Sequence, residues 1–111
     1  MSQALIDNLR RAREFQVTAG GHAFTLRRPT DAEAIALGGS TPIDLVRRFV
    51  VGWNLAEMDV IPGGGPEPAA FSSDLWAMWV DDRPDLWGVL SEAVFGAYKS
   101  HTEAREDAAK N

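Results

Sequence analysis

The sequence contains no cysteine, only two histidines, and no apolar run longer than a handful of residues. Without cysteine, the chain can form no disulfide, thiol nucleophile or thiolate metal site. The short apolar runs cannot span a membrane, which requires about 20 consecutive apolar residues. The first residues also lack the basic-then-apolar order of a signal peptide. These absences lead us to expect a soluble protein of the cytoplasm.

Positive charge is also scarce, since 11 Lys and Arg stand against 16 Asp and Glu, which gives a net charge of -5. Nucleic-acid binding depends on neutralising phosphates, so this balance argues against a nucleic-acid partner. It equally disfavours adhesion to an anionic membrane. The arginines do cluster, however, and a local basic patch is the alternative to solvated side chains at Arg10, Arg11, Arg13, Arg27, Arg28, Arg47 and Arg48.

Motifs that would indicate catalysis or ligand binding are missing as well. Neither His22 nor His101 has a second ligand at metal-binding spacing, and no serine lies in a Gly-x-Ser-x-Gly elbow. Asp81-Asp82 lacks the alternating oxygen ligands of a calcium loop. The glycines at 63–65 lead into Pro66-Glu67 instead of the Lys-Ser/Thr of a phosphate loop. We therefore expect a non-enzymatic protein with no catalytic residue, no metal site and no cofactor.

The length of 111 residues fits one domain, and 45% hydrophobic with 24% charged residues is typical of a globular protein. Residues 3–13 can form a helix with Leu5, Ile6 and Leu9 on one side and arginines on the other. Two runs of alternating polar and apolar residues, 14–18 and 22–27, flank Gly20-Gly21. This pattern predicts a β-hairpin, which helices must cover on its apolar face.

The rest of the chain reads as helices and one long loop. Thr30 with Glu33, and Thr41 followed by Pro42, mark two helix starts. The second of these helices is amphipathic as far as Trp53, with Ile43, Val46, Phe49, Val50 and Trp53 at helical spacing. Residues 57–70 are rich in glycine and proline, so we expect a flexible loop without regular hydrogen-bond partners. Further helices follow from Ser72 and from Pro84 to about Ala108, with fraying over 102–111.

These elements predict an α+β fold, a mainly α-helical single domain over residues 1–111 with an N-terminal β-hairpin. The four tryptophans indicate how it could bind a partner, because large aromatic side chains are enriched in binding hot spots. Trp76, Val80 and Phe95 fall outside the main apolar stripes of their helices. They would form an apolar patch for a partner helix or for self-association, unless the hairpin face covers them.

From Phe24 to Asn111 the chain resembles the small tail assembly chaperones of long-tailed bacteriophages and prophages. The resemblance rests on the order of several features. A strand runs into a capped helix at 24–30, and Val51-Gly52-Trp53 ends an apolar helix before a Gly/Pro loop. Phe71-Ser72, an acidic turn before Pro84, a long helix and a charged stretch closing on Lys110-Asn111 complete the order.

The resemblance implies a factor of the host cytoplasm that is absent from the finished virion. Such chaperones bind the tape measure protein, keep it soluble and recruit tail tube subunits. Many are also made as a longer product by translational frameshifting near the end of the short reading frame. The family carries no catalytic residue. The main alternative is a structural part of the virion, a head-tail connector or tail terminator, and such parts form closed rings.

Overall fold

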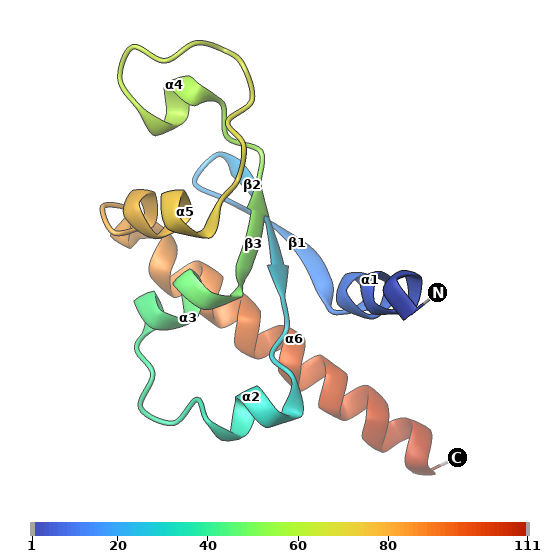
Figure 1. Ribbon diagram of the computed structural model, residues 1–111. Helices are drawn as coiled ribbons and strands as arrows, with labels where there is room; N and C mark the ends of the chain where they lie inside the picture. The colour runs from blue at the N-terminus through green and yellow to red at the C-terminus, as the bar shows by residue number, and fades with distance from the viewer. Residues whose placement is uncertain (1, 111) are drawn as a thin grey trace.

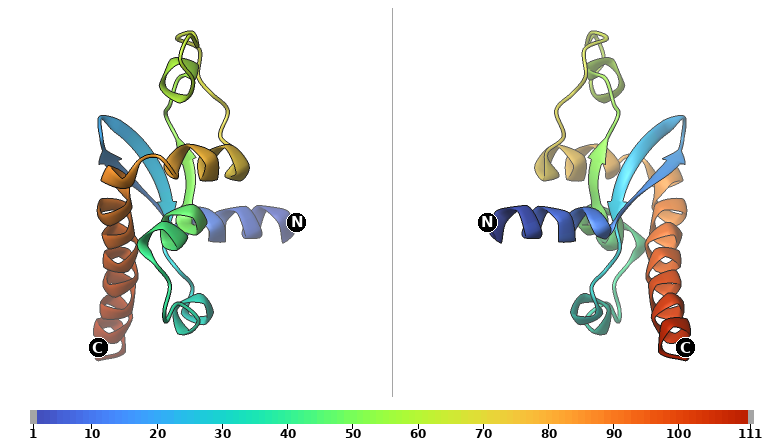
Figure 2. Two further views of the ribbon diagram at one scale, coloured as in Figure 1. Left: turned by 90° about the vertical axis from the view of Figure 1, so that its left-hand side faces the viewer. Right: turned by 90° about the vertical axis from the view of Figure 1, so that its right-hand side faces the viewer.

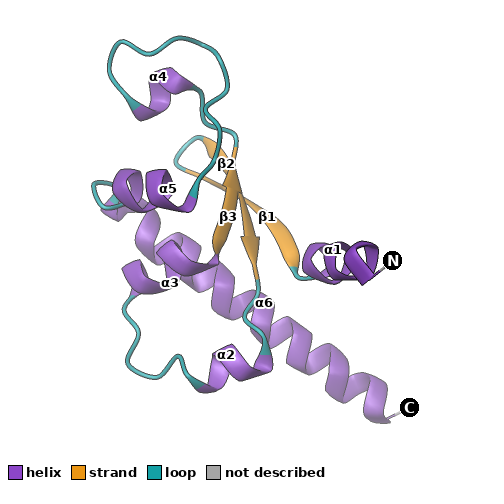
Figure 3. Ribbon diagram, in the orientation of Figure 1, coloured by secondary structure: helices purple, strands orange, loops and turns teal. Residues whose placement is uncertain are grey.

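The computed structural model of the chain describes residues 2–110. Its elements, in chain order, are α1 (Ser2–Ala12), β1 (Glu14–Ala19), β2 (His22–Arg27), α2 (Asp31–Ile35), α3 (Pro42–Phe49), β3 (Val50–Trp53), α4 (Glu57–Val60), α5 (Ser73–Val80) and α6 (Pro84–Lys110). The strands form one antiparallel sheet in the order β1-β2-β3, near the centre of the molecule (Figure 1). The long helix α6 runs along one side, and α1 projects away from it (Figure 2). The predicted α+β class, mainly helical, is confirmed (Figure 3).

The N-terminal hairpin forms where the alternating residues predict it. β1 and β2 pair without interruption, from Glu14 opposite Arg27 to Ala19 opposite His22. The turn between them has φ angles of 58° and 81° at its two glycines, a region that residues with a side chain rarely adopt. Alternation turns the apolar side chains of both strands to one face, where they join the core.

The helix expected as far as Trp53 ends four residues early, because its last turn is a strand. β3 runs antiparallel to β2, with Val50 opposite Leu26 and Trp53 opposite Phe24. The register shifts by one residue between these pairs, as in a β-bulge. Both β3 side chains can therefore pack on the core although they are three residues apart, a spacing that also suits a helix. The prediction of a continuous helix is wrong for this reason.

Trp76, on α5, lies at the centre of the core, between the sheet and α3. Its side chain is fully buried, and its ring centroid is 5.5 Å from that of Phe24. The indole Nε1–H donates a hydrogen bond of 3.0 Å to the carbonyl of Val46. This bond satisfies a donor that would be costly to bury alone, and it fixes the ring orientation. The remaining buried core residues are Phe24, Leu26, Leu45, Val46, Phe49, Val50, Val80, Leu86, Leu90 and Val94.

The Gly/Pro segment after α4 is held by backbone hydrogen bonds. The amide of Glu57 donates to the carbonyl of Glu67 at 2.9 Å, and the amide of Met58 donates to that of Gly65 at 3.0 Å. The segment projects from the body of the domain (Figure 1) but closes on itself through these bonds. The expectation that its backbone lacks partners is wrong, whereas its flexibility stays a prediction.

Two tryptophans tie the same segment to the domain. Trp53 donates its indole N–H to the carbonyl of Ala69 at 2.8 Å, and Trp79 donates to that of Asp59 at 3.1 Å. Both bonds join a core element to the projecting segment, one near its start and one near its end. The base of the segment is therefore anchored while its tip faces solvent.

Helix α6 continues to Lys110, two residues past its predicted end. Its second half is joined to α2 by Asp31, which accepts a hydrogen bond from the Tyr98 hydroxyl at 2.9 Å and forms an ion pair with Arg105. The hydrogen bonds from Arg105 and then Tyr98 lower the pKa of Asp31 from 3.8 to about 2. Fraying over residues 102–111 stays a prediction, and Asn111 lies outside the described residues.

The anchored segment makes Gly64 sensitive to substitution. A Cβ at this position would lie 2.6 Å from the backbone carbonyl group of Glu57, so the backbone would have to move. We expect Gly64→Ala to lower the free energy of unfolding by about 1–3 kcal/mol in urea titrations followed by tryptophan fluorescence. Gly38 has open space around its Cβ position and serves as the control, with a change under about 0.5 kcal/mol for Gly38→Ala. Equal stability of both variants would contradict a packed segment.

Candidate partner-binding surface

The patch predicted from Trp76, Val80 and Phe95 does not form one surface. Trp76 and Val80 are fully buried, and only Phe95 is exposed, at 52%. The hairpin supplies part of the cover, because Phe24 on β2 lies against Trp76. This is the alternative that the sequence left open. Phe95 stays on the outer side of α6, so any binding there would involve other neighbours.

A different apolar surface lies on α1. Leu5, Ile6 and Leu9 are 72%, 43% and 54% exposed, and no residue of this helix is buried. The three side chains fall within about 100° of one another around the helix axis, so they share one side. We call them the α1 apolar stripe. Helices of 11 residues are marginal without tertiary packing, and α1 has none from a buried side chain.

The surface is hollowed where α1 meets the sheet. The hollow has a volume of about 490 Å³ and is lined by Arg10, Arg13, Glu14, Arg27, Thr30, Glu33 and Val51. Along β2, Arg27 follows the buried Leu26, and successive strand residues point to opposite faces. The hollow therefore lies on the face of the sheet away from the core. Three guanidinium groups and two carboxylates share its wall.

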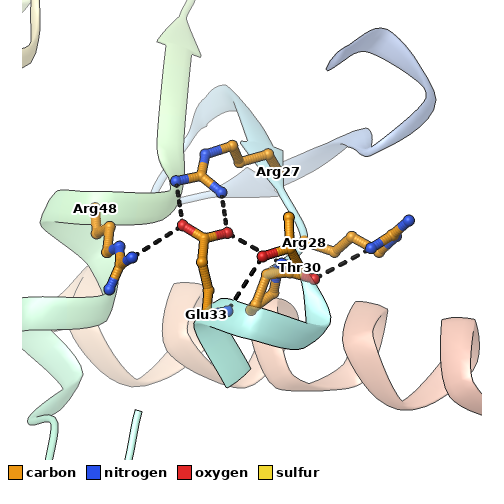
Figure 4. Close-up of polar contacts among 6 residues, drawn as sticks. Arg27, Arg28, Thr30, Glu33 and Arg48 are labelled. Atoms are coloured by element: carbon orange, nitrogen blue, oxygen red, sulfur yellow. Dashed lines mark hydrogen bonds and ion pairs between the residues drawn. The ribbon is translucent and has the colours of Figure 1, made fainter. Parts of the chain in front are cut away.

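Glu33 organises one side of this hollow. Arg27 donates two hydrogen bonds to its carboxylate, at 2.7 and 3.0 Å, and Arg48 donates a third at 3.0 Å (Figure 4). Glu33 and Thr30 also complete a capping box at the start of α2, as predicted from their spacing. The hydrogen bonds from Arg27 are the main cause that lowers the pKa of Glu33 from 4.5 to about 2, against an opposing effect of burial.

Arg13, on the other side of the hollow, lacks such a partner. Its Nε is buried and receives no hydrogen-bond acceptor from residues 2–110. The backbone carbonyl of Arg13 accepts a hydrogen bond of 2.9 Å from the amide of Arg28. This bond holds the backbone of Arg13 beside the end of β2. Arg10 pairs only with Asp7, at 3.9 Å on the exposed surface, where such pairs are weak. The hollow thus carries positive charge that the described part of the chain does not pair closely.

The histidines and acidic side chains of residues 2–110 form no candidate metal site. Within that range, no three His, Asp or Glu side chains lie together as metal ligands would. His22 packs edge-on beside Phe24 and Trp79, and His101 lies beside Tyr98. The described helices also include none with the length and hydrophobicity needed to cross a bilayer.

The apolar side of α1 was evident from the sequence, but its exposure was not predicted. A usable signal was present in the strand that follows, because the residues of β1 and β2 that alternate with apolar ones are polar. Gln16, for example, donates to Thr25 across the outer face of the sheet at 2.8 Å. Val51, which lines the hollow, is one of the few apolar side chains that this face offers. The unpaired Nε of Arg13 depends on three-dimensional packing and could not be read from spacing.

The ion pairs of Glu33 predict a defined effect of pH. A carboxylate whose pKa is lower in the folded state stabilises the fold above its unfolded pKa, and this contribution is lost as pH falls from about 4.5 to about 2. We expect the chain to lose stability across this window, and Glu33→Gln to lose less while being about 1–3 kcal/mol less stable at pH 7. Urea titrations at several pH values measure both effects.

Asp82→Asn is the matched control for this experiment. Asp82 is exposed and makes no ion pair within residues 2–110. Its substitution should leave both the stability at pH 7 and the acid profile close to those of the unaltered chain. A Glu33→Gln variant that behaves like the Asp82→Asn variant would contradict a stabilising role for the ion pairs of Glu33 with Arg27 and Arg48.

Comparison with known proteins adds no further constraint on this surface. No family model, no curated protein and no solved structure matches the chain. The surface has two distinctive features: the exposed α1 apolar stripe, and the arginine-lined hollow at the C-terminal end of α1.

Proposed function

We propose that the chain is a phage tail assembly chaperone that binds the tape measure protein through the apolar stripe of α1. The observation that carries this proposal is the exposure of Leu5, Ile6 and Leu9 on a helix that buries no residue. Burial of apolar area is the main favourable contribution to most protein association. A helix that is short, amphipathic and uncovered gains most from a partner that supplies the missing packing.

The chemistry of the partner fits this role. A tape measure protein presents long amphipathic helices that would aggregate without cover. The α1 apolar stripe offers such a helix an apolar side to pack against, so that two amphipathic helices would cover each other. The net charge of -5 on the chaperone would keep the complex soluble.

The remaining parts of the proposal follow the resemblance in sequence. The chaperone would act in the host cytoplasm, would be absent from the virion, and would recruit tail tube subunits by a surface away from α1. The exposed Phe95 on α6 is the candidate centre of that second surface. A head-tail connector or tail terminator would instead form a closed ring, so a stable oligomer of the isolated chain would favour that alternative.

The proposal predicts the effect of removing the stripe. Leu5→Ser combined with Leu9→Ser should weaken binding to the tape measure protein more than about tenfold, because each leucine contributes roughly 1.5–3 kcal/mol when it is buried. Stability of the free chain should change by less than about 0.5 kcal/mol per site, since neither side chain is buried. Co-purification after co-expression measures binding, and circular dichroism with urea titration measures folding.

Ile35→Ser is the matched control, because Ile35 is an apolar side chain of α2 that is 87% exposed and lies outside the stripe. The Ile35→Ser variant should still co-purify with the tape measure protein. Retention of the tape measure protein by a folded double variant would contradict the proposal. Unfolding of the double variant would show that the stripe is packed within the domain.

A further inference from the structure

The α1 apolar stripe leads directly into the arginine-lined hollow. Residues four apart lie on the same side of a helix, so Arg10 follows Ile6 and Arg13 follows Leu9 at the next turn. Arg13 comes one residue after α1, and its amide still donates to the carbonyl of Arg10 at 3.1 Å, so the helical turn continues to this point. Any partner helix that covers the stripe would therefore bring its next turn over the hollow.

Some charged groups that line the hollow form ion pairs within the domain, and others do not. Glu33 is occupied by Arg27 and Arg48, and so those three groups are already paired. Arg10 makes only the exposed pair with Asp7, and Arg13 makes no ion pair in residues 2–110. Glu14, the second carboxylate of the wall, pairs with neither arginine in that range. The Nε of Arg13 is enclosed, so a ligand in the hollow would contact the guanidinium where Arg13 lines it. A carboxylate is the acceptor that matches guanidinium geometry best.

We infer that the hollow binds a carboxylate side chain of the partner, one helical turn beyond the apolar side chains that cover Leu5 and Leu9. The inference rests on the proposed function, because it assumes that a partner helix lies on the α1 apolar stripe. It adds the identity of the flanking residue, an aspartate or glutamate, and assigns its recognition to Arg13. Arg10 at the rim would add attraction that falls as salt rises.

Two synthetic peptides provide the test. Both are 18-residue amphipathic helices with a leucine stripe, and they differ only in a pair of residues one turn beyond it, two glutamates in one and two glutamines in the other. The glutamate peptide should bind the unaltered chain about tenfold more tightly at low salt, as expected for a charge-assisted hydrogen bond. Arg13→Gln should remove this preference.

Arg11→Gln is the matched control, because Arg11 lies on the side of α1 away from the stripe and does not line the hollow. This variant removes the same charge two residues earlier in the chain and should retain the preference for the glutamate peptide. Equal binding of both peptides to the unaltered chain would overturn the inference and leave the proposed function standing. Equal loss of preference in both arginine variants would also overturn it, because the effect would then come from net charge alone.

A second measurement separates the inference from the proposed function. The side-chain Nε–H of Arg13 can be followed by NMR while succinate is added, with no peptide present. A saturable shift of this signal that is absent for Arg11 is the expected result, and it can be observed even if neither peptide binds. No shift would overturn the inference. A shift at lower concentrations of inorganic phosphate than of succinate would overturn the assignment of a carboxylate.

Discussion

The burial of Trp76 is the constraint on which the rest of the domain depends. A small domain has room for one core, and here the largest buried side chain lies between the inner face of the sheet and the helices. Its ring requires Phe24 from the hairpin on one side, and its N–H requires the carbonyl of Val46 on α3. The hairpin, α3 and α5 are therefore fixed relative to one another by a single residue.

Placing the whole core on one face of the sheet has a consequence for the other face. That face is mainly polar, as the Gln16–Thr25 hydrogen bond illustrates, and α1 buries no side chain against it. The N-terminal helix is amphipathic all the same, so its apolar side remains in solvent. The ion pairs of Glu33 with Arg27 and Arg48 form one side of the hollow at the C-terminal end of α1. Arg13, whose Nε has no acceptor in residues 2–110, lies on the other side. The exposure of the α1 apolar stripe is thus a consequence of where the core lies.

Local patterns in the sequence were sufficient for the parts of the fold that depend on neighbours in the chain. The hairpin turn needed glycine for its positive φ angles, and the α2 cap needed Thr30 and Glu33 at fixed spacing. Long-range packing was not accessible in the same way. The bulge in β3 gave Val50 and Trp53 a spacing that also suits a helix, and no local signal separates the two.

The candidate site was harder to predict than the fold for the same reason. Trp76 appeared free on a helical wheel because its partner, Phe24, is more than 50 residues away in the chain. The apolar stripe of α1 was visible in the sequence, but its exposure depends on what the sheet offers it. The hollow beside Arg13 is lined by residues from α1, β1, β2, α2 and β3, and no pattern of spacing in the sequence predicts that arrangement.

Hydrogen exchange of α1 in the free and partner-bound chain tests the central claim most directly. In the free chain, the amides of residues 2–12 should exchange rapidly, because no side chain of this helix is buried against the domain. In complex with the tape measure protein, the same amides should slow by more than about tenfold, while those of the Trp76 core stay protected in both states. Unchanged exchange in α1, with new protection confined to other elements such as α6 around Phe95, would contradict the account.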